Sequence, residues 1–283
     1  MSTNVRTLVG AKVNGKNLPV QSVSSNENND YLKLKASATV NYDLVAIKQV
    51  MPEQTLETYD IDTVVNLFVD SSSNTLNYFI TDSTIQFYAG KFATTPSGGN
   101  FYEATGVLKE QLNKALLFVS GINCNIGEPL NITLQSRGTP IDVTTTNLSN
   151  FDLTHSSVVT VSEFVDGTNT LGCRNFKLGV TPKFYDHYEN AVSPEFSALT
   201  GIDVSLSLTV LLDTAIAAID TTQCRDLTLN LVRYQKCGLE PVSWGSITFA
   251  NSLVRISNQS LRLEDVAEVE LEIIPETILI EKS

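Results

Sequence analysis

Ile202-Asp-Val-Ser-Leu-Ser-Leu-Thr-Val210 is the stretch that decides the fold class. Apolar and polar side chains alternate at every position through it, which is the period of a β-strand with one buried and one solvated face. Strand signals recur along most of the chain, at 32–40, 64–69, 75–80, 84–88, 158–164, 176–180, 227–231, 246–249, 253–260 and 266–274. The sequence therefore predicts a mainly β protein, an antiparallel β-sandwich or half-barrel with one or two short flanking helices.

The sequence also predicts one hairpin turn and two helices between the strands. Asn14-Gly15, between Val13 and Leu18, predicts a two-residue type I′ hairpin turn. Residues 104–118 carry apolar side chains at a spacing of three to four, which predicts an amphipathic helix that covers one face of its own sheet or binds a partner. A second, short apolar helix is predicted at 211–219.

Composition sets the domain organisation. A chain of 283 residues suggests two domains or one large β-domain, and either arrangement can bury a core without disulfides or metals to stabilise it. The polar tract 142–150 has no periodicity and is typical of a connector. We therefore expect a β-rich domain over 1–145, which includes the helix at 104–118, and an acidic β-rich domain over 146–283.

Charge excludes some partners. The net charge is −12, and residues 141–283 alone carry 19 acidic against 9 basic side chains. Nucleic-acid binding through phosphates needs a basic patch, and none is visible in the sequence. The N-terminus lacks the basic and apolar run of a secretion signal, and no run approaches the about 18 apolar residues of a membrane-spanning helix.

No catalytic constellation can be recognised. The sequence contains no nucleophile elbow, P-loop, dinucleotide-binding glycine motif or metalloprotease helix. The two histidines, His155 and His187, are too few for a zinc site with cysteines that show no C-x-x-C spacing. The four cysteines (Cys124, Cys173, Cys224, Cys237) are interpreted as buried or incidental thiols. We expect no enzymatic activity, no cofactor and no metal.

The last long strand has an unusual acidic face. Glu268, Glu270 and Glu272 alternate with Val269, Leu271 and Ile273, so the three carboxylates share one face. Like charges at that spacing repel one another unless water or a cation screens them. Two interpretations remain open, a solvated outer strand whose charges blunt edge pairing and the wall of a wet channel.

Two stretches carry a resemblance: residues 244–274, with the Ile256-Ser-Asn-Gln-Ser-Leu261 strand and the Glu264-Asp265 turn, and residues 13–20, followed by the strand at 31–40. The first resembles the closing hairpin, and the second the opening hairpin, of the tail-tube and baseplate-hub proteins of phages. The resemblance implies a virion structural protein whose subunits join edge to edge into rings that stack into a tube. A chain with two such domains would suit a trimeric ring with pseudo-sixfold symmetry, whereas one with a single tube domain would carry a decorating domain.

The resemblance also assigns partners and a site. The expected partners are other copies of the chain, further tail or baseplate proteins, and DNA that passes without specific binding. Glu268, Glu270 and Glu272 would then face the lumen of the tube. The alternatives are an adhesin or receptor-binding module that presents Tyr185, Tyr188 and Asn190, a capsid-associated virion protein, and an enzyme on a β-scaffold.

Overall fold

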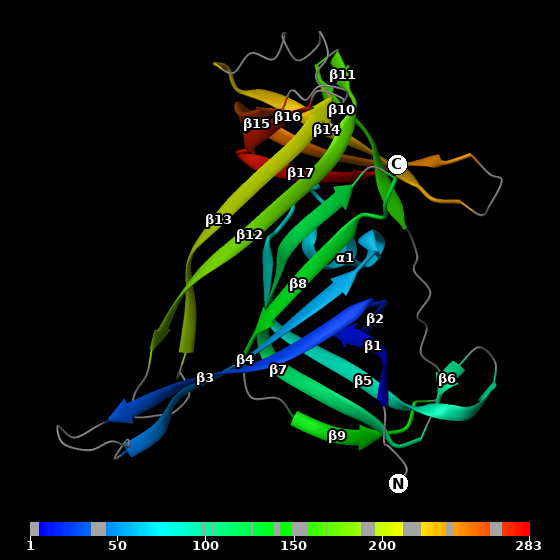
Figure 1. Ribbon diagram of the computed structural model, residues 1–283, viewed down its shortest axis with the longest axis vertical. Coiled ribbons are helices and arrows are strands. Elements are labelled where there is room, and N and C mark those ends of the chain that lie inside the picture. Colours follow the sequence, from blue (N-terminus) through cyan, green and yellow to red (C-terminus); the bar gives the residue numbers. More distant parts are fainter. Residues whose placement is uncertain are drawn as a thin grey trace.

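The computed structural model describes residues 6–34, 44–97, 100–103, 105–125, 127–138, 142–148, 158–167, 169–187, 196–211, 222–235, 240–260 and 268–283. Over these residues the protein is mainly β and antiparallel, as the alternating sequence predicts. Figure 1 shows long, strongly twisted strands near the short helix α1 (Ile61–Phe68), with long hairpins that extend toward the lower left of the view.

The elements fall into two sets. The first set, which we call the N unit, comprises β1 (Arg6–Val13), β2 (Lys16–Leu18), β3 (Ser22–Leu34), β4 (Leu44–Thr58), α1 (Ile61–Phe68), β5 (Phe79–Ser97), β6 (Asn100–Tyr102), β7 (Val107–Asn125), β8 (Asn131–Arg137) and β9 (Asp142–Thr146). The second set, the C unit, comprises β10 (Val159–Asp166), β11 (Asn169–Leu171), β12 (Cys173–His187), β13 (Phe196–Leu211), β14 (Arg225–Arg233), β15 (Val242–Ser260), β16 (Glu268–Ile274) and β17 (Thr277–Lys282).

One pattern of strand pairing occurs twice. In the N unit the pairs are β1–β2, β1–β5, β3–β4, β4–β8, β5–β7, β7–β8 and β7–β9, apart from the short β5–β6 pair, which has no counterpart among the described strands of the C unit. In the C unit the pairs are β10–β11, β10–β14, β12–β13, β13–β16, β14–β15, β15–β16 and β15–β17. Each pair of the first series corresponds to one of the second, in the same chain order. The two units are therefore two copies of one topology.

The irregularities of the strands repeat as well. Four register shifts have a counterpart at the equivalent place: Leu8/Gly10 with Val161/Glu163, Asp30/Tyr31 with Lys183/Phe184, Ser83/Ile85 with Arg225/Leu227, and Val119/Gly121 with Ile256/Asn258. A β-bulge is a specific local feature that a strand does not need in order to pair. Four coincidences of this kind indicate an internal duplication.

The units are joined by one pair of strands. The end of β7 pairs with the start of β12, from Asn125 opposite Asn175 to Gly121 opposite Gly179. One continuous antiparallel sheet therefore runs across both units, in the spatial order β3–β4–β8–β7–β12–β13–β16–β15. We call it the long sheet. Beyond the long sheet, β7 continues into a second layer that it forms with β5, β1 and β9. In the same way, β15 continues into a second layer with β14, β10 and β17.

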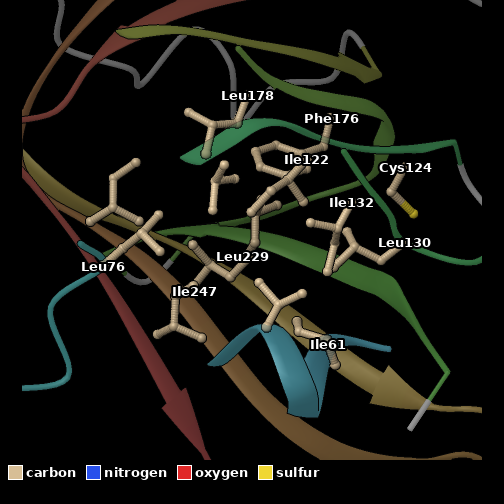
Figure 2. Packing of buried hydrophobic residues seen from close by; sticks show 14 of the residues in the cluster. Ile61, Leu76, Ile122, Cys124, Leu130, Ile132, Phe176, Leu178, Leu229 and Ile247 are labelled. Carbon is tan, nitrogen blue, oxygen red and sulfur yellow. The ribbon is translucent and has the colours of Figure 1, made fainter. Parts of the chain in front are cut away.

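The two units share one hydrophobic core. A single cluster of buried side chains contains residues of both, and Figure 2 shows Ile122 and Ile132 of the N unit beside Phe176 and Leu178 of the C unit. Burial of this apolar surface, at about 25 cal/mol per Å², is the main stabilising contribution. The division into domains 1–145 and 146–283 stays a prediction, and the one buried cluster contains residues from both ranges.

The helix α1 connects the two units through polar contacts. Asp60 caps it by accepting a hydrogen bond from the backbone nitrogen of Thr63 at 3.2 Å. In its first turn, Asp62 Oδ1 accepts a hydrogen bond from Trp244 Nε1 of β15 at 3.1 Å and lies 2.8 Å from Lys282 Nζ of β17. Trp244 is 1% exposed, so this carboxylate satisfies the only polar atom of a buried indole.

Two of the predicted elements are wrong. Residues 104–118 do not form a helix, because 107–125 is the strand β7. Residues 64–69 do not form a strand, since 61–68 is α1. The strands expected separately at 246–249 and 253–260 are one strand, β15. The helix predicted at 211–219 lies outside the described residues except for Leu211, which ends β13.

The hairpin at Asn14-Gly15 is confirmed. Both residues have positive φ, 51° and 79°, as a type I′ turn requires, and Val13 pairs with Lys16. Its counterpart in the C unit is the turn between Asp166 and Asn169, which are also paired.

Candidate functional site

The long sheet has one buried and one polar face. Side chains on the buried face belong to the shared core, for example Leu56, Leu134, Ile122, Leu178, Leu208 and Leu271. Their neighbours along each strand point the other way and are polar: Thr55, Glu57, Thr133, Gln135, Asn123, Lys177, Thr181, Asp203, Ser205, Ser207, Thr209, Glu270, Glu272 and Arg255. We call this surface the polar face. It crosses both units without interruption.

The three glutamates predicted as a site lie on the polar face, in β16. This strand pairs with β13 on one side and β15 on the other, so it is not an edge strand and its charges do not blunt one. Glu268 lies 3.3 Å from Arg174, and Glu272 lies 3.6 Å from Arg255. Glu270 is exposed and faces Thr209 and Asn258 across the sheet. Basic neighbours therefore reduce the repulsion that the sequence alone indicates.

Other carboxylates on the polar face also have basic neighbours. Lys183 Nζ donates to Asp203 Oδ1 at 2.8 Å, and Arg137 Nε lies 3.9 Å from Glu53 Oε1. Both contacts are partly or largely solvent-exposed, so each is expected to contribute less than about 1 kcal/mol. The result is a hydrophilic, mixed-charge surface without a basic cluster. Such a surface makes weak, screened contacts with a polyanion.

A shallow groove lies where the units join. Its volume is about 340 Å³, and Gly121 and Gly179, directly opposite each other, are in its lining together with Asn123 and Lys177. A side chain at Gly179 would place a Cβ 2.8 Å from Ser205 Oγ, so there is no room for a larger residue at this position of the joint. A neighbouring groove of about 250 Å³ holds Arg137, whose guanidinium carbon lies 4.5 Å from the centre of the Phe184 ring.

No catalytic or metal-binding arrangement emerges from the described residues. No group of three His, Cys, Asp or Glu side chains among them could hold a metal ion. His187 is the last residue of β12 and pairs with Phe196, while His155 lies outside the described residues. No helix within the described ranges is long and apolar enough to cross a membrane. Of the aromatic residues considered for an adhesin, Tyr185 is exposed on β12, and Tyr188 lies outside the described part.

Two strand edges are the features that the sequence analysis missed. In the described part of the chain, β3 pairs with β4 alone, and the segment Leu253–Ser260 of β15 pairs with β16 alone. These are the two ends of the long sheet. Backbone donors and acceptors along a strand edge are a template for pairing with another chain. The repeated turns at Asn14-Gly15 and Asp166-Gly167, each before a long hairpin, are the signal that could have revealed the duplication and hence the edges.

Comparison with protein-family models and with curated proteins finds no match for this chain. The arguments for function therefore depend on the duplicated topology, the polar face and the two edges.

Proposed function

We propose that the protein is a non-enzymatic structural subunit that assembles into rings, as the subunits of a phage tail tube or baseplate hub do. The polar face of the long sheet lines the central channel, through which DNA passes without specific binding. The protein acts in a virion, with other copies of itself and neighbouring tail proteins as its partners.

One observation carries this proposal: two copies of the same topology within one chain are joined edge to edge through β7 and β12. This joint can be repeated between chains. The two outer strands of the long sheet, β15 and β3, are the counterparts of β7 and β12, which form the joint inside the chain. Repetition of a heterologous joint produces either a closed ring or an open filament.

The polar face supports the DNA part of the proposal. A channel that carries a nucleic acid has to avoid strong phosphate contacts, which a basic wall would supply. Its carboxylates (Glu53, Glu57, Asp203, Glu268, Glu270, Glu272) and its polar residues create a wall that phosphates do not bind tightly. The net charge of −12 acts in the same direction over longer distances at low salt.

Sedimentation of the purified protein over a wide concentration range tests the proposal. We expect a discrete oligomer whose mass is a small multiple of the 30.9 kDa chain. A monomer at every concentration would refute the proposal.

A further inference from the structure

We propose that the end of β15, Asn258–Ser260, in one copy pairs, antiparallel, with Ser24–Asn26 of β3 in a second copy, in the register that the joint between β7 and β12 already has inside the chain. This inference rests on the proposed ring assembly and names the surfaces that form it.

The duplication identifies the partners. In the repeated topology β7 corresponds to β15, and β12 corresponds to β3. Inside the chain the free side of β7 is occupied by β12. The equivalent side of β15 and the equivalent side of β3 have no strand on them among the described residues. The C unit of one copy therefore offers to the next copy the edge that the N unit offers to its own C unit.

The register follows from the repeated shifts. Gly121 of β7 pairs with Thr133, and its counterpart Asn258 of β15 pairs with Glu270, in both cases directly after the shift. Lys183 precedes the shift in β12 as Asp30 does in β3. These two anchors convert three of the five pairs of the internal joint into pairs between copies, and the other two would fall beyond Ser260, outside the described residues. Gly121–Gly179 becomes Asn258–Asn26, Ile122–Leu178 becomes Gln259–Ser25, and Asn123–Lys177 becomes Ser260–Ser24.

The composition of both edges fits this role. Ser22-Val-Ser-Ser-Asn26 and Ile256-Ser-Asn-Gln-Ser260 contain no charged residue and no proline. Natural proteins use charged residues, especially lysine, and proline to keep exposed edges from pairing with another chain. The absence of charged residues and proline from these two segments is therefore expected if the segments pair with another chain.

The two edges differ, so the interface is heterologous. A copy that binds through β15 still has a free β3, and the opposite holds for its neighbour. Every added copy extends the long sheet by the same eight strands, and closure leaves no free edge. A closed sheet has no aggregation-prone edge, which favours a ring over an open chain.

Cysteine cross-linking between two variants tests the register. Ser24→Cys and Ser260→Cys are made in separate chains, each in a Cys224→Ser, Cys237→Ser background, and one chain carries a mass tag. After mixing at an assembling concentration and mild oxidation, we expect a disulfide between tagged and untagged chains, and none when either variant is oxidised alone. The control pairs Ser260→Cys with Asn28→Cys, which lies about 13 Å further along β3 and should not cross-link.

Hydrogen exchange of the unmodified protein gives a second reading that needs no variant. Backbone amides at 24–26 and 258–260 should gain protection in the oligomer relative to the dilute chain. Oligomers without the cross-link and without this protection would overturn the inference while leaving ring assembly intact. Cross-linking of either variant with itself would also overturn it. Absence of any oligomer would refute both the inference and the proposed function.

Discussion

Lys114 of β7 and Asn251 of β15 adopt the same left-handed backbone conformation, with φ of 48° and 50°, at equivalent points of two duplicated strands. Each lies within the shift at which β7 pairs with β5 and β15 pairs with β14. Asparagine tolerates this conformation, whereas a lysine there is strained. The shared geometry therefore comes from the common topology and not from the local residue type.

Replacement of Lys114 by Asn should stabilise the protein, because Asn accepts positive φ more readily. The expected gain in the free energy of unfolding is about 0.5–1 kcal/mol. Chemical denaturation monitored by fluorescence measures it. Lys109→Asn in the same strand is the control and should give no gain, since Lys109 has no positive φ. Equal stabilisation by both variants would contradict the strain at Lys114.

Gly245 should tolerate no side chain. Its φ is +147°, and a Cβ built on it would lie 1.9 Å from the carbonyl oxygen of Glu281 in the neighbouring strand β17. Gly245→Ala should therefore cost about 3 kcal/mol or more and detach β17. Gly201→Ala is the matched control, because its Cβ would meet only Lys183 Cδ at 3.8 Å, an ordinary contact. A thermal midpoint unchanged by Gly245→Ala would show that β17 does not pack there.

The cysteines should differ sharply in reactivity. Burial, together with the neighbouring Cys124, raises the pKa of the Cys173 thiol to about 12, whereas Cys224 is exposed. Only the thiolate reacts with an alkylating agent. At pH 8 we expect iodoacetamide to label Cys224 rapidly, and Cys124 and Cys173 only after unfolding. Peptide mapping by mass spectrometry checks this. Rapid labelling of Cys173 in the native protein would contradict its burial. Cys237 lies outside the described residues.

The raised pKa of Cys173 also predicts a dependence of stability on pH. The unfolded thiol ionises near its ordinary value of 9.0, but the folded thiol keeps its proton up to about 12. The stabilisation is therefore complete below pH 9 and is lost as the pH rises toward 12. Cys173→Ala should reduce this alkaline loss, measured by urea denaturation at pH 8 and pH 10.5. An identical loss in variant and wild type would refute the contribution of this thiol.

The glutamates of β16 should keep DNA from binding to the assembled protein. Replacement of Glu268, Glu270 and Glu272 by Lys should leave assembly possible and create DNA binding that weakens steeply with salt, because phosphate contacts release counterions. Fluorescence anisotropy with labelled duplex DNA measures it. The triple Gln variant is the control: it removes the charges, and the contacts with Arg174 and Arg255, without adding positive charge. An oligomer of the Lys variant that does not bind DNA would contradict the position of these three residues in the channel wall.

Much of the strand pattern could be predicted from the sequence, because one solvated face makes period-two alternation visible. Residues 202–210 and 268–274 alternate cleanly and lie in β13 and β16. Strand β7 was misinterpreted for a physical reason. Its buried residues include Leu112, Ala115 and Leu117, and the extra residues at the shift near Lys114 change the spacing from two to three. That spacing imitates a helix.

The helix α1 was missed for the opposite reason. Val64-Val65 and Phe68-Val69 have high strand propensity, and burial in the shared core overrides this local preference. The cap at Asp60 with Thr63 three residues later was the available signal. Periodicity does not reveal the duplication and the two edges, since the equivalent strands share shifts and pairing partners; in the sequence only the two glycine turns before the long hairpins repeat.

Negative-stain electron microscopy of the unmodified protein across a concentration series tests most directly whether the duplicated units continue from chain to chain. We predict closed rings with a central hole, in which the number of repeating units around the rim is twice the number of chains. Particles that remain monomers, or that form compact dimers without a hole at every concentration, would contradict it.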